Sequence, residues 1–335
     1  MLCSLFNSCV TDPTPIAVAT GTFGAHAVFI VNEGSGHGDA SLDYYQPDSG
    51  TYYSDFFHNA NPTAVLGEFA NDIIVCGKDS LLVLVNGLDS LWLISGKTGK
   101  LLRTYSLPTK CSAEKLVMLN DSEAIITSAR APAPVLLEQG IWHGSTGIDA
   151  TLKIGAFPIN IARLRNTIFV SANGGSEIDI IQYPASTSSV MNVGAAPATI
   201  VIRDDTSAAV ICSAYGTSDA KVYFFNPTTF MITRTTSVPG NPSKMALDGN
   251  LLYVALDSSV IRLDFTQPML RDTFISAAAH IAPYGIAVDN VTHSVYLSDA
   301  KGFSQRGSLT VFDNAKHLIT QQATGIAPGT MLITH

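Results

Sequence analysis

The stretch Ser35-Gly36-His37-Gly38-Asp39 places a hydroxyl, an imidazole and a carboxylate within five residues. Acid–base catalysis or metal ligation would need at least one more side chain held in fixed geometry. Glycines on both sides of His37 leave the backbone flexible, so this stretch is a poor scaffold for such geometry. We therefore predict a polar loop that contacts a ligand, with no catalytic residue, no metal site and no cofactor.

The glycines at 34, 36 and 38 follow the β-rich run Val28–Val31, as in a dinucleotide-binding loop. That loop needs G-x-G-x-x-G and then a helix, but the third glycine position is Asp39. The following residues 40–45 alternate like a strand, which indicates a hairpin. A second motif, Gly96-Lys97-Thr98, resembles the end of a P-loop, but Leu91 stands where a P-loop needs glycine. Neither loop is predicted to bind phosphate.

Composition excludes several classes of partner. The chain has 335 residues, of which 46% are hydrophobic and 14% are charged, with a formal net charge of −8. Nucleic acids and anionic membranes both require a basic footprint, so we expect neither as a partner. No apolar run reaches the roughly 18–20 residues that span a bilayer. Any membrane attachment is expected to be through a lipid anchor.

The cysteines and histidines carry little metal-binding signal. The eight histidines are scattered without an HExxH or His-x-His pair, and the five cysteines show no zinc spacing. Cys76 and Cys212 lie in apolar runs and are predicted to be small buried residues. Cys9 follows Leu5-Phe6-Asn7-Ser8 and is similar to a lipidated cysteine, although a basic segment before it is missing. The predicted organisation is a lipoprotein-like signal remnant and linker over 1–20 and one domain over 21–335.

Prolines recur at positions 158, 197, 242, 283 and 328, which are 39 to 45 residues apart. Each is followed by a short apolar run, and in the first four units a turn and a second apolar strand come next, as in TIFVSA and LLYVAL. Four strands every 40 to 45 residues are typical of propeller blades. Inner strands are predicted to start near 69, 112, 158, 197, 242, 283 and 328, with no helix. We therefore predict an all-β, seven-bladed β-propeller of four-stranded antiparallel blades, closed by pairing of residues 328–334 with the N-terminal blade.

The proline-led inner strands and the TGK turn at 98–100 resemble those of YVTN-type, YncE-like seven-bladed propellers. VNEGSGHGDASLDYYQPDSGTYY and FANDIIVCGKDSLLVLVNGLDSLWLISGKTGKL are similar to segments of a narrower set, the cell-surface lipoproteins of Bacteroidetes-type bacteria. That set includes BtuG-like proteins, which capture cobalamin and hand it to an outer-membrane transporter. The resemblance implies an extracytoplasmic protein on the outer membrane. It transfers no ligand-contacting residue to this chain.

Polar and aromatic residues at the ends of second strands and in the loops that follow are expected to converge above the central channel. The long loops of the first and seventh blades should lie side by side there, and the connection after the first blade adds two residues. The predicted ligand-binding residues are Asn32, Glu33, His37, Phe57, His58, Asn86, Arg130, Asn173, Tyr215, Asp257, Phe303 and Arg306. Trp142 and His143 are assigned to a hairpin tip, with docking of a partner protein as the alternative.

The predicted function is that of a binding protein without catalysis. It captures a bulky polar nutrient, with a corrinoid such as cobalamin as the leading candidate, and passes it to an outer-membrane transporter. Two alternatives stay open: a structural or interaction propeller of a surface complex, and a metal-dependent propeller lactonase or lyase.

Overall fold

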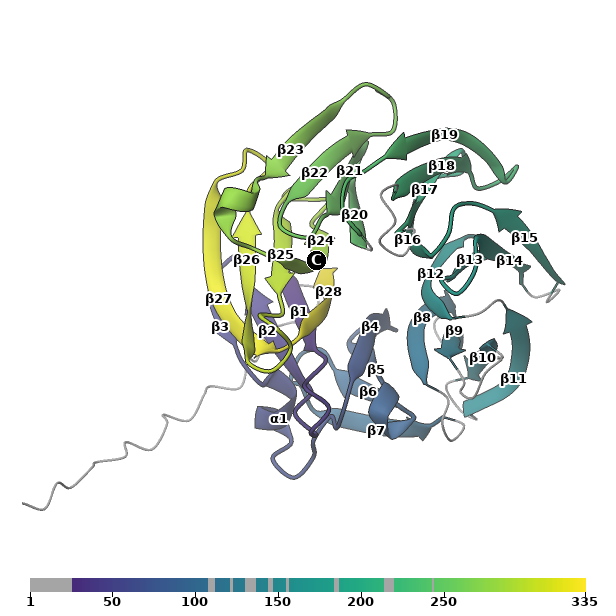
Figure 1. Cartoon of the computed structure of the whole chain (residues 1–335). Helices are drawn as coiled ribbons and strands as arrows, with labels where there is room; N and C mark the ends of the chain where they lie inside the picture. Colours follow the sequence, from purple (N-terminus) through teal and green to yellow (C-terminus); the bar gives the residue numbers. More distant parts are fainter. Residues whose placement is uncertain are drawn as a thin grey trace, which may run out of the picture.

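The fold is all-β and consists of four-stranded antiparallel sheets. The computed structural model describes residues 26–107, 112–120, 123–129, 137–143, 147–154, 157–183, 187–213, 220–242 and 244–335. Apart from one pair that joins the two ends of the described chain, hydrogen-bonded neighbours in each sheet are consecutive strands, and the sheets surround a common axis like the blades of a propeller (Figure 1). The predicted propeller of four-stranded antiparallel blades is confirmed to this extent.

The strands pair into seven such sheets. Sheet 1 contains β28 (Pro328–Thr334), β1 (Ala27–Asn32), β2 (Ser41–Gln46) and β3 (Thr51–Tyr53). Sheet 2 contains β4 (Ala70–Cys76), β5 (Ser80–Val85), β6 (Ser90–Ser95) and β7 (Leu101–Ser106). Sheet 3 contains β8 (Ala113–Asn120), β9 (Glu123–Ala129), β10 (Leu137–His143) and β11 (Gly147–Ile154), and the side chains of Trp142 and His143 lie outside the described set.

The other four sheets follow in chain order. Sheet 4 contains β12 (Pro158–Leu164), β13 (Thr167–Ala172), β14 (Glu177–Gln182) and β15 (Thr187–Asn192). Sheet 5 contains β16 (Pro197–Asp204), β17 (Ser207–Cys212), β18 (Lys221–Asn226) and β19 (Met231–Ser237). Sheet 6 contains β20 (Lys244–Asp248), β21 (Leu251–Ala255), β22 (Val260–Asp264) and β23 (Arg271–Ile275). Sheet 7 contains β24 (Pro283–Val288), β25 (Val295–Asp299), β26 (Arg306–Phe312) and β27 (Leu318–Ile326).

The position of a strand within its sheet explains its sequence pattern. Second strands are covered on both faces by neighbouring sheets, so β5 is buried continuously over Leu81–Val85. Outermost strands face solvent on one side, and β19 is mostly exposed. This is why the second strands are short continuous apolar runs while outer strands alternate. Cys76 and Cys212 are buried free thiols inside this core, as predicted.

The two ends of the described chain pair with each other. β28 is the inner strand of sheet 1 and lies antiparallel to β1, with Ile30 opposite Met331 and Ala27 opposite Thr334. We call this pairing the seam. It confirms the prediction that residues 328–334 supply the missing inner strand, and it leaves β28 without a free edge toward β1.

One prediction about the connection between sheets 1 and 2 is wrong. No helix was expected, but residues Phe56–Ala60 form the short helix α1, and 3₁₀ turns occur at Asn86–Leu88 (η1) and Ala277–Ala279 (η3). Five residues are too few to show a helical apolar period, and so short a helix depends on tertiary contacts. Those contacts are present: Phe56 and Phe57 are buried, and Asn61 Nδ2 donates to the carbonyls of Phe57 and Gly99 at 2.8 Å.

Phe57 therefore belongs to the core between sheets 1 and 2. Its side chain is 1% exposed and meets the Trp92 ring edge-on at a centroid distance of 5.3 Å. We predict that Phe57→Ala lowers the free energy of unfolding by about 3–5 kcal/mol, because the truncation leaves a cavity. Urea denaturation measures this change. Phe303→Ala, at a half-exposed position, is the matched control and should cost far less; equal losses would contradict a core role for Phe57.

Candidate ligand site at the channel mouth

A recurrent β-bulge at the start of the inner strands builds the site. In six sheets, the pairing of the inner strand with the second strand leaves out at least one residue directly after the first residue of the inner strand. These inner strands are β4, β8, β12, β16, β24 and β28. A bulge re-aims side chains and bends the strand. Here the residues at the bulge and just after it line cavities in the central channel, as Asn71 with Asp72 and Glu114 with Lys115 show.

Two adjoining cavities lie in the channel. We call the one of about 200 Å³, lined by Glu33 and Tyr284, the upper cavity, and the one of about 250 Å³, lined by Asp72 and Thr330, the lower cavity. Apart from Glu33, which follows β1, the lining residues of both cavities come from the inner strands, and the two share Lys115, Asn160, Thr199 and Lys244. Such volumes are below the roughly 300–1,000 Å³ usual for a whole drug-sized ligand. The channel can therefore take a small molecule or one substituent of a larger one.

Lys115 is fully engaged within the protein. Its Nζ donates to Asp72 Oδ1 at 3.1 Å, to the carbonyl of Asn71 at 2.9 Å and to Thr330 Oγ1 at 2.9 Å. Asp72 Oδ2 also accepts the backbone N–H of Leu116 at 2.9 Å. This network joins the inner strands of sheets 1, 2 and 3, so Lys115 positions the channel wall rather than a ligand.

Two glutamates face the upper cavity with amide or hydroxyl partners. Glu114 accepts from Asn71 Nδ2 at 3.2 Å and from Asn86 Nδ2 at 3.4 Å, and burial raises the pKa of Glu114 to about 7. Glu33 accepts the Tyr284 hydroxyl at 2.7 Å. Burial and the neighbouring Glu33 carboxylate raise the pKa of Tyr284, so this hydroxyl stays a donor. At neutral pH Glu114 can either donate or accept a hydrogen bond.

Lys244 differs from Lys115 because none of the described residues is its hydrogen-bond or ion-pair partner. Within the described part of the chain, no hydrogen bond or ion pair is found for its Nζ, while it lines both cavities. The Lys244 side chain is half-buried, because the channel that it lines admits water. Protein atoms nevertheless surround its ammonium group inside the channel. Burial and then the charge of Lys115 lower the pKa of Lys244 to about 8. An ammonium group so placed is available to a carboxylate, carbonyl or phosphate of a ligand.

The repeats contain a signal for these residues that proline spacing alone does not show. When the repeats are aligned, one column of the alignment contains the residue two positions after the inner-strand proline. Where the strand has no proline, it contains the residue two positions after the first strand residue. The residues of this column surround the channel. That column reads Asp72, Lys115, Asn160, Thr199, Lys244, Gly285 and Thr330. Six of its seven residues are polar and line the lower cavity. Aligning the repeats on this column identifies Lys115 and Lys244, which the search for loop residues missed.

The structure brings three of the sequence-predicted residues to this mouth. Glu33 lines the upper cavity and Asn86 contacts Glu114. Phe303 packs edge-on against Tyr284, the partner of Glu33, at a centroid distance of 4.9 Å. The long loops of sheets 1 and 7 therefore approach one another through Tyr284.

Three other predicted residues meet beside the channel. Phe57, His58 and Arg306 line a cavity of about 360 Å³, together with residues 38–41 of the β1–β2 loop. Phe57 contributes little surface there because it is almost completely buried. His37 is exposed in the same loop, with Nδ1 3.0 Å from Ser35 Oγ, and Asp39 accepts from Ser35 Oγ at 2.6 Å. The Ser35–Asp39 loop is thus ordered by its own hydrogen bonds.

The remaining predicted residues are not gathered at either cavity. Asn32 is buried and donates to Ser41 Oγ at 3.0 Å, and Asn173 donates to the carbonyl of Pro197 at 3.2 Å. Asp257 is exposed in the turn between β21 and β22. The predicted residues that lie outside the described part of the chain are Cys9, Arg130 and Tyr215. Among the described residues, no helix is long and apolar enough to cross a membrane.

Residues 26–324 match the family described as "Domain of unknown function (DUF5074)". The chain belongs to this family. The match covers nearly all of the described propeller, from the residue before β1 to the end region of β27. No curated protein matches the sequence.

Solved structures similar to this DUF5074 propeller support the fold. A quinonprotein alcohol dehydrogenase-like protein from Bacteroides thetaiotaomicron is 13% identical, with a TM-score of 0.69 over 92% of this chain and 78% of that one. A functionally unknown protein from Desulfotomaculum acetoxidans is 12% identical, with a TM-score of 0.68 over 93% and 99%. Hydrazine synthase from Kuenenia stuttgartiensis is 13% identical, with a TM-score of 0.59 over 77% and 88%. Identities this low establish the propeller architecture alone.

The lowered pKa of Lys244 predicts a pH-dependent stability cost. A lysine with a folded pKa of about 8 and an unfolded value near 10.5 destabilises the fold fully below pH 8. The cost disappears as pH rises from 8 to 10.5. We predict that Lys244→Met raises the free energy of unfolding at pH 7 by about 1–3 kcal/mol, and that the gain shrinks toward pH 10.5.

Chemical denaturation at pH 7 and at pH 10 measures the effect of Lys244→Met. The control is Lys100→Met, at an exposed position, which should change stability by less than about 0.5 kcal/mol at either pH. A Lys244→Met protein less stable than the parent at pH 7 would show that Lys244 has a stabilising partner and is not available to a ligand.

Proposed function

We propose that this protein is a non-catalytic binding propeller at the cell surface, which captures a bulky polar nutrient at the channel mouth and passes it to an outer-membrane transporter. A corrinoid such as cobalamin is the leading candidate ligand. In this proposal the binding unit is a closed, seven-bladed ring. The protein is an extracytoplasmic outer-membrane lipoprotein, anchored through Cys9.

The observation that carries the binding role is the Lys244 ammonium in a polar, preformed channel, where no described residue forms a hydrogen bond or ion pair with it. Asn160, Thr199 and Glu114 line the same cavity and can form hydrogen bonds with a ligand in either direction. Burying an unpaired cation lowers its pKa and opposes folding, so its presence is better explained by a ligand than by stability. A preformed wall also limits the ordering cost of binding.

The sizes of the cavities favour a ligand whose body stays outside the channel. Cavities of about 200 and 250 Å³ accept a side group, and the neighbouring cavity of about 360 Å³ beside His58 and Arg306 offers a second contact. A corrinoid carries amide side groups around a flat body, so one amide or its phosphate could approach Lys244 while the body rests on the loops. Phe303, half-exposed beside Tyr284, presents an aromatic face for that body.

Two other classes of function compete. Exposed Phe303 at the mouth and exposed Val65 at the cavity beside the channel could instead contact a partner protein of a surface complex. An enzyme is favoured by Glu114, with a pKa of about 7, and Lys244, with a pKa of about 8, since perturbed groups near neutrality often mark catalytic sites. A lactonase or lyase of the metal-dependent type would need donors on the channel wall. In the described residues the group of His and Asp side chains close enough to hold an ion lies elsewhere.

Calorimetric titration of the purified protein with cyanocobalamin tests the proposal. We expect one-to-one binding that weakens at least tenfold in each of Lys244→Met, His37→Ala and Phe303→Ala. The matched control is His317→Ala, an exposed histidine away from the mouth, which should bind like the parent.

Each other outcome identifies a rival. If no heat and no thermal stabilisation appear at high ligand concentration, the corrinoid is excluded. Recovery of a transporter from detergent-solubilised outer membranes, without small-molecule binding, would favour the interaction propeller. Turnover of lactone substrates that is lost in Glu114→Gln would favour the enzyme. Absence of lipid labelling on Cys9 in cells would remove the anchor from the proposal.

A further inference from the structure

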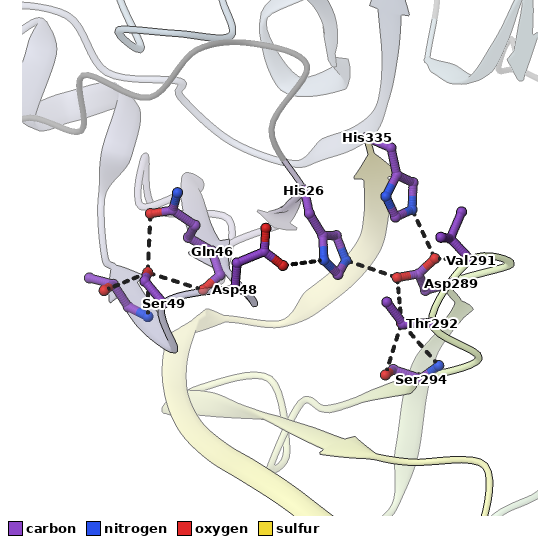
Figure 2. Close-up of polar contacts among 10 residues, drawn as sticks. His26, Gln46, Asp48, Ser49, Asp289, Val291, Thr292, Ser294 and His335 are labelled. Carbon is purple, nitrogen blue, oxygen red and sulfur yellow. Dashed lines mark hydrogen bonds and ion pairs between the residues drawn. The ribbon is translucent and has the colours of Figure 1, made fainter.

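Three side chains from distant parts of the sequence meet at the end of the seam away from the channel mouth. His26 precedes β1, His335 follows β28 and Asp289 follows β24. Figure 2 shows both imidazoles directed at the Asp289 carboxylate. One donor atom from each residue lies within 4.8 Å of the others, and the two rings stack with centroids 4.6 Å apart. The antiparallel register of β1 and β28 brings the two histidines together.

The Asp289 carboxylate is fixed before any ligand arrives. Its side chain is completely buried, Oδ1 accepts the backbone N–H of Val291 at 2.8 Å, and Oδ2 accepts the Thr292 hydroxyl at 2.6 Å. His335 Nε2 lies 2.8 Å from Oδ1 and His26 Nε2 lies 2.8 Å from Oδ2. The carboxylate is therefore held between two imidazole nitrogens.

The second imidazole nitrogen of His26 explains why this cluster differs from an ordinary ion pair. Its Nδ1 lies 3.0 Å from Asp48 Oδ1, which favours a proton on Nδ1. The neutral ring then directs the Nε2 lone pair at Asp289 Oδ2. His26 is only 9% exposed, and its buried Nε2 makes no hydrogen bond among the described residues, although it lies 2.8 Å from Asp289 Oδ2. Two electron-rich atoms so close together require a cation between them, either a proton or a metal ion.

We propose that His26, Asp289 and His335 bind a divalent transition-metal ion of the zinc class, with Asp48 as a positioning residue for His26. Two imidazoles and one carboxylate suit such an ion, and a carboxylate hydrogen-bonded to the other nitrogen of a metal-bound histidine is the usual supporting arrangement. Three protein ligands leave one coordination position open. A cavity of about 260 Å³, lined by Asp289 and His335, gives an ion access to it.

The geometry needs only a small adjustment to hold the ion. With metal–ligand distances near 2.0–2.1 Å, tetrahedral ligand atoms lie about 3.3 Å apart. The present separations run from 2.8 Å to at most 4.8 Å. The His26–Asp289 separation must open from 2.8 Å by about 0.5 Å, and rotation of the His335 side chain, which is 39% exposed, supplies the rest of the movement. The bound ion would link sheets 1 and 7 across the end of the seam, independently of any ligand in the channel.

Metal-stripped protein titrated with Zn²⁺ tests this site. We expect one equivalent to bind and to raise the melting temperature, and Co²⁺ to give the visible absorption bands of a nitrogen- and oxygen-ligated ion. His335→Gln and Asp289→Asn should each weaken Zn²⁺ binding by more than tenfold, and Asp48→Asn by roughly 10–100-fold. His335→Gln is the key variant, because its half-exposed position makes misfolding an inadequate explanation.

The matched control is His293→Gln. His293 also lies 2.8 Å from an aspartate, Asp248, but that pair has no second histidine recorded within the described residues. This variant should bind Zn²⁺ like the parent. Equal Zn²⁺ binding by His335→Gln and the parent overturns the proposal. It is also overturned if Zn²⁺ does not bind to the metal-stripped parent, because a proton then occupies the place assigned to the metal.

Discussion

Pairing of β1 with β28 is the contact on which the other features depend. It places the bulged start of β28 at the channel mouth, where Thr330 accepts from Lys115 and Gly329 lies against Glu33. At the far end of the same strand, it brings His335 next to His26. Both the channel wall and the histidine cluster would lose residues if this pairing opened. The seam therefore couples the two ends of the channel through one seven-residue strand.

In the channel, a repeated backbone feature, the β-bulge at the start of the inner strands, positions chemically different side chains. Bulges in six of the inner strands turn the same two positions toward the axis, and the residues that line the channel include acids, lysines, amides and hydroxyls. Most of these groups neutralise or hydrogen-bond one another. Lys244 is the exception within the described residues, and its lowered pKa records the free-energy cost of that position. Sites that violate the rules of stability in this way are where binding or catalysis is expected.

Much of the fold follows from the sequence because each repeat carries its own proline, turn and apolar strand. The start of the inner strand at Pro158 and the closing role of residues 328–334 are readable for that reason. The helix at Phe56–Ala60 is not, because tertiary contacts rather than an apolar period stabilise it. Lys244 lies in an ordinary strand pattern, so its role appears only when repeats are aligned. His26, Asp289 and His335 share no local motif, and only the closed ring brings them together.

The seam also has a consequence for how the protein folds. Within each sheet, contacts between consecutive strands are local, but the β1–β28 contacts join residues about as far apart as the described chain allows. Closing so long a loop has a large entropic cost, and folding rates fall as contacts become less local. We therefore expect the open ring of sheets to form first and the pairing of β28 with β1 to form last. Until then β1 exposes an unpaired edge, which makes this species the one most prone to exchange strands with another molecule.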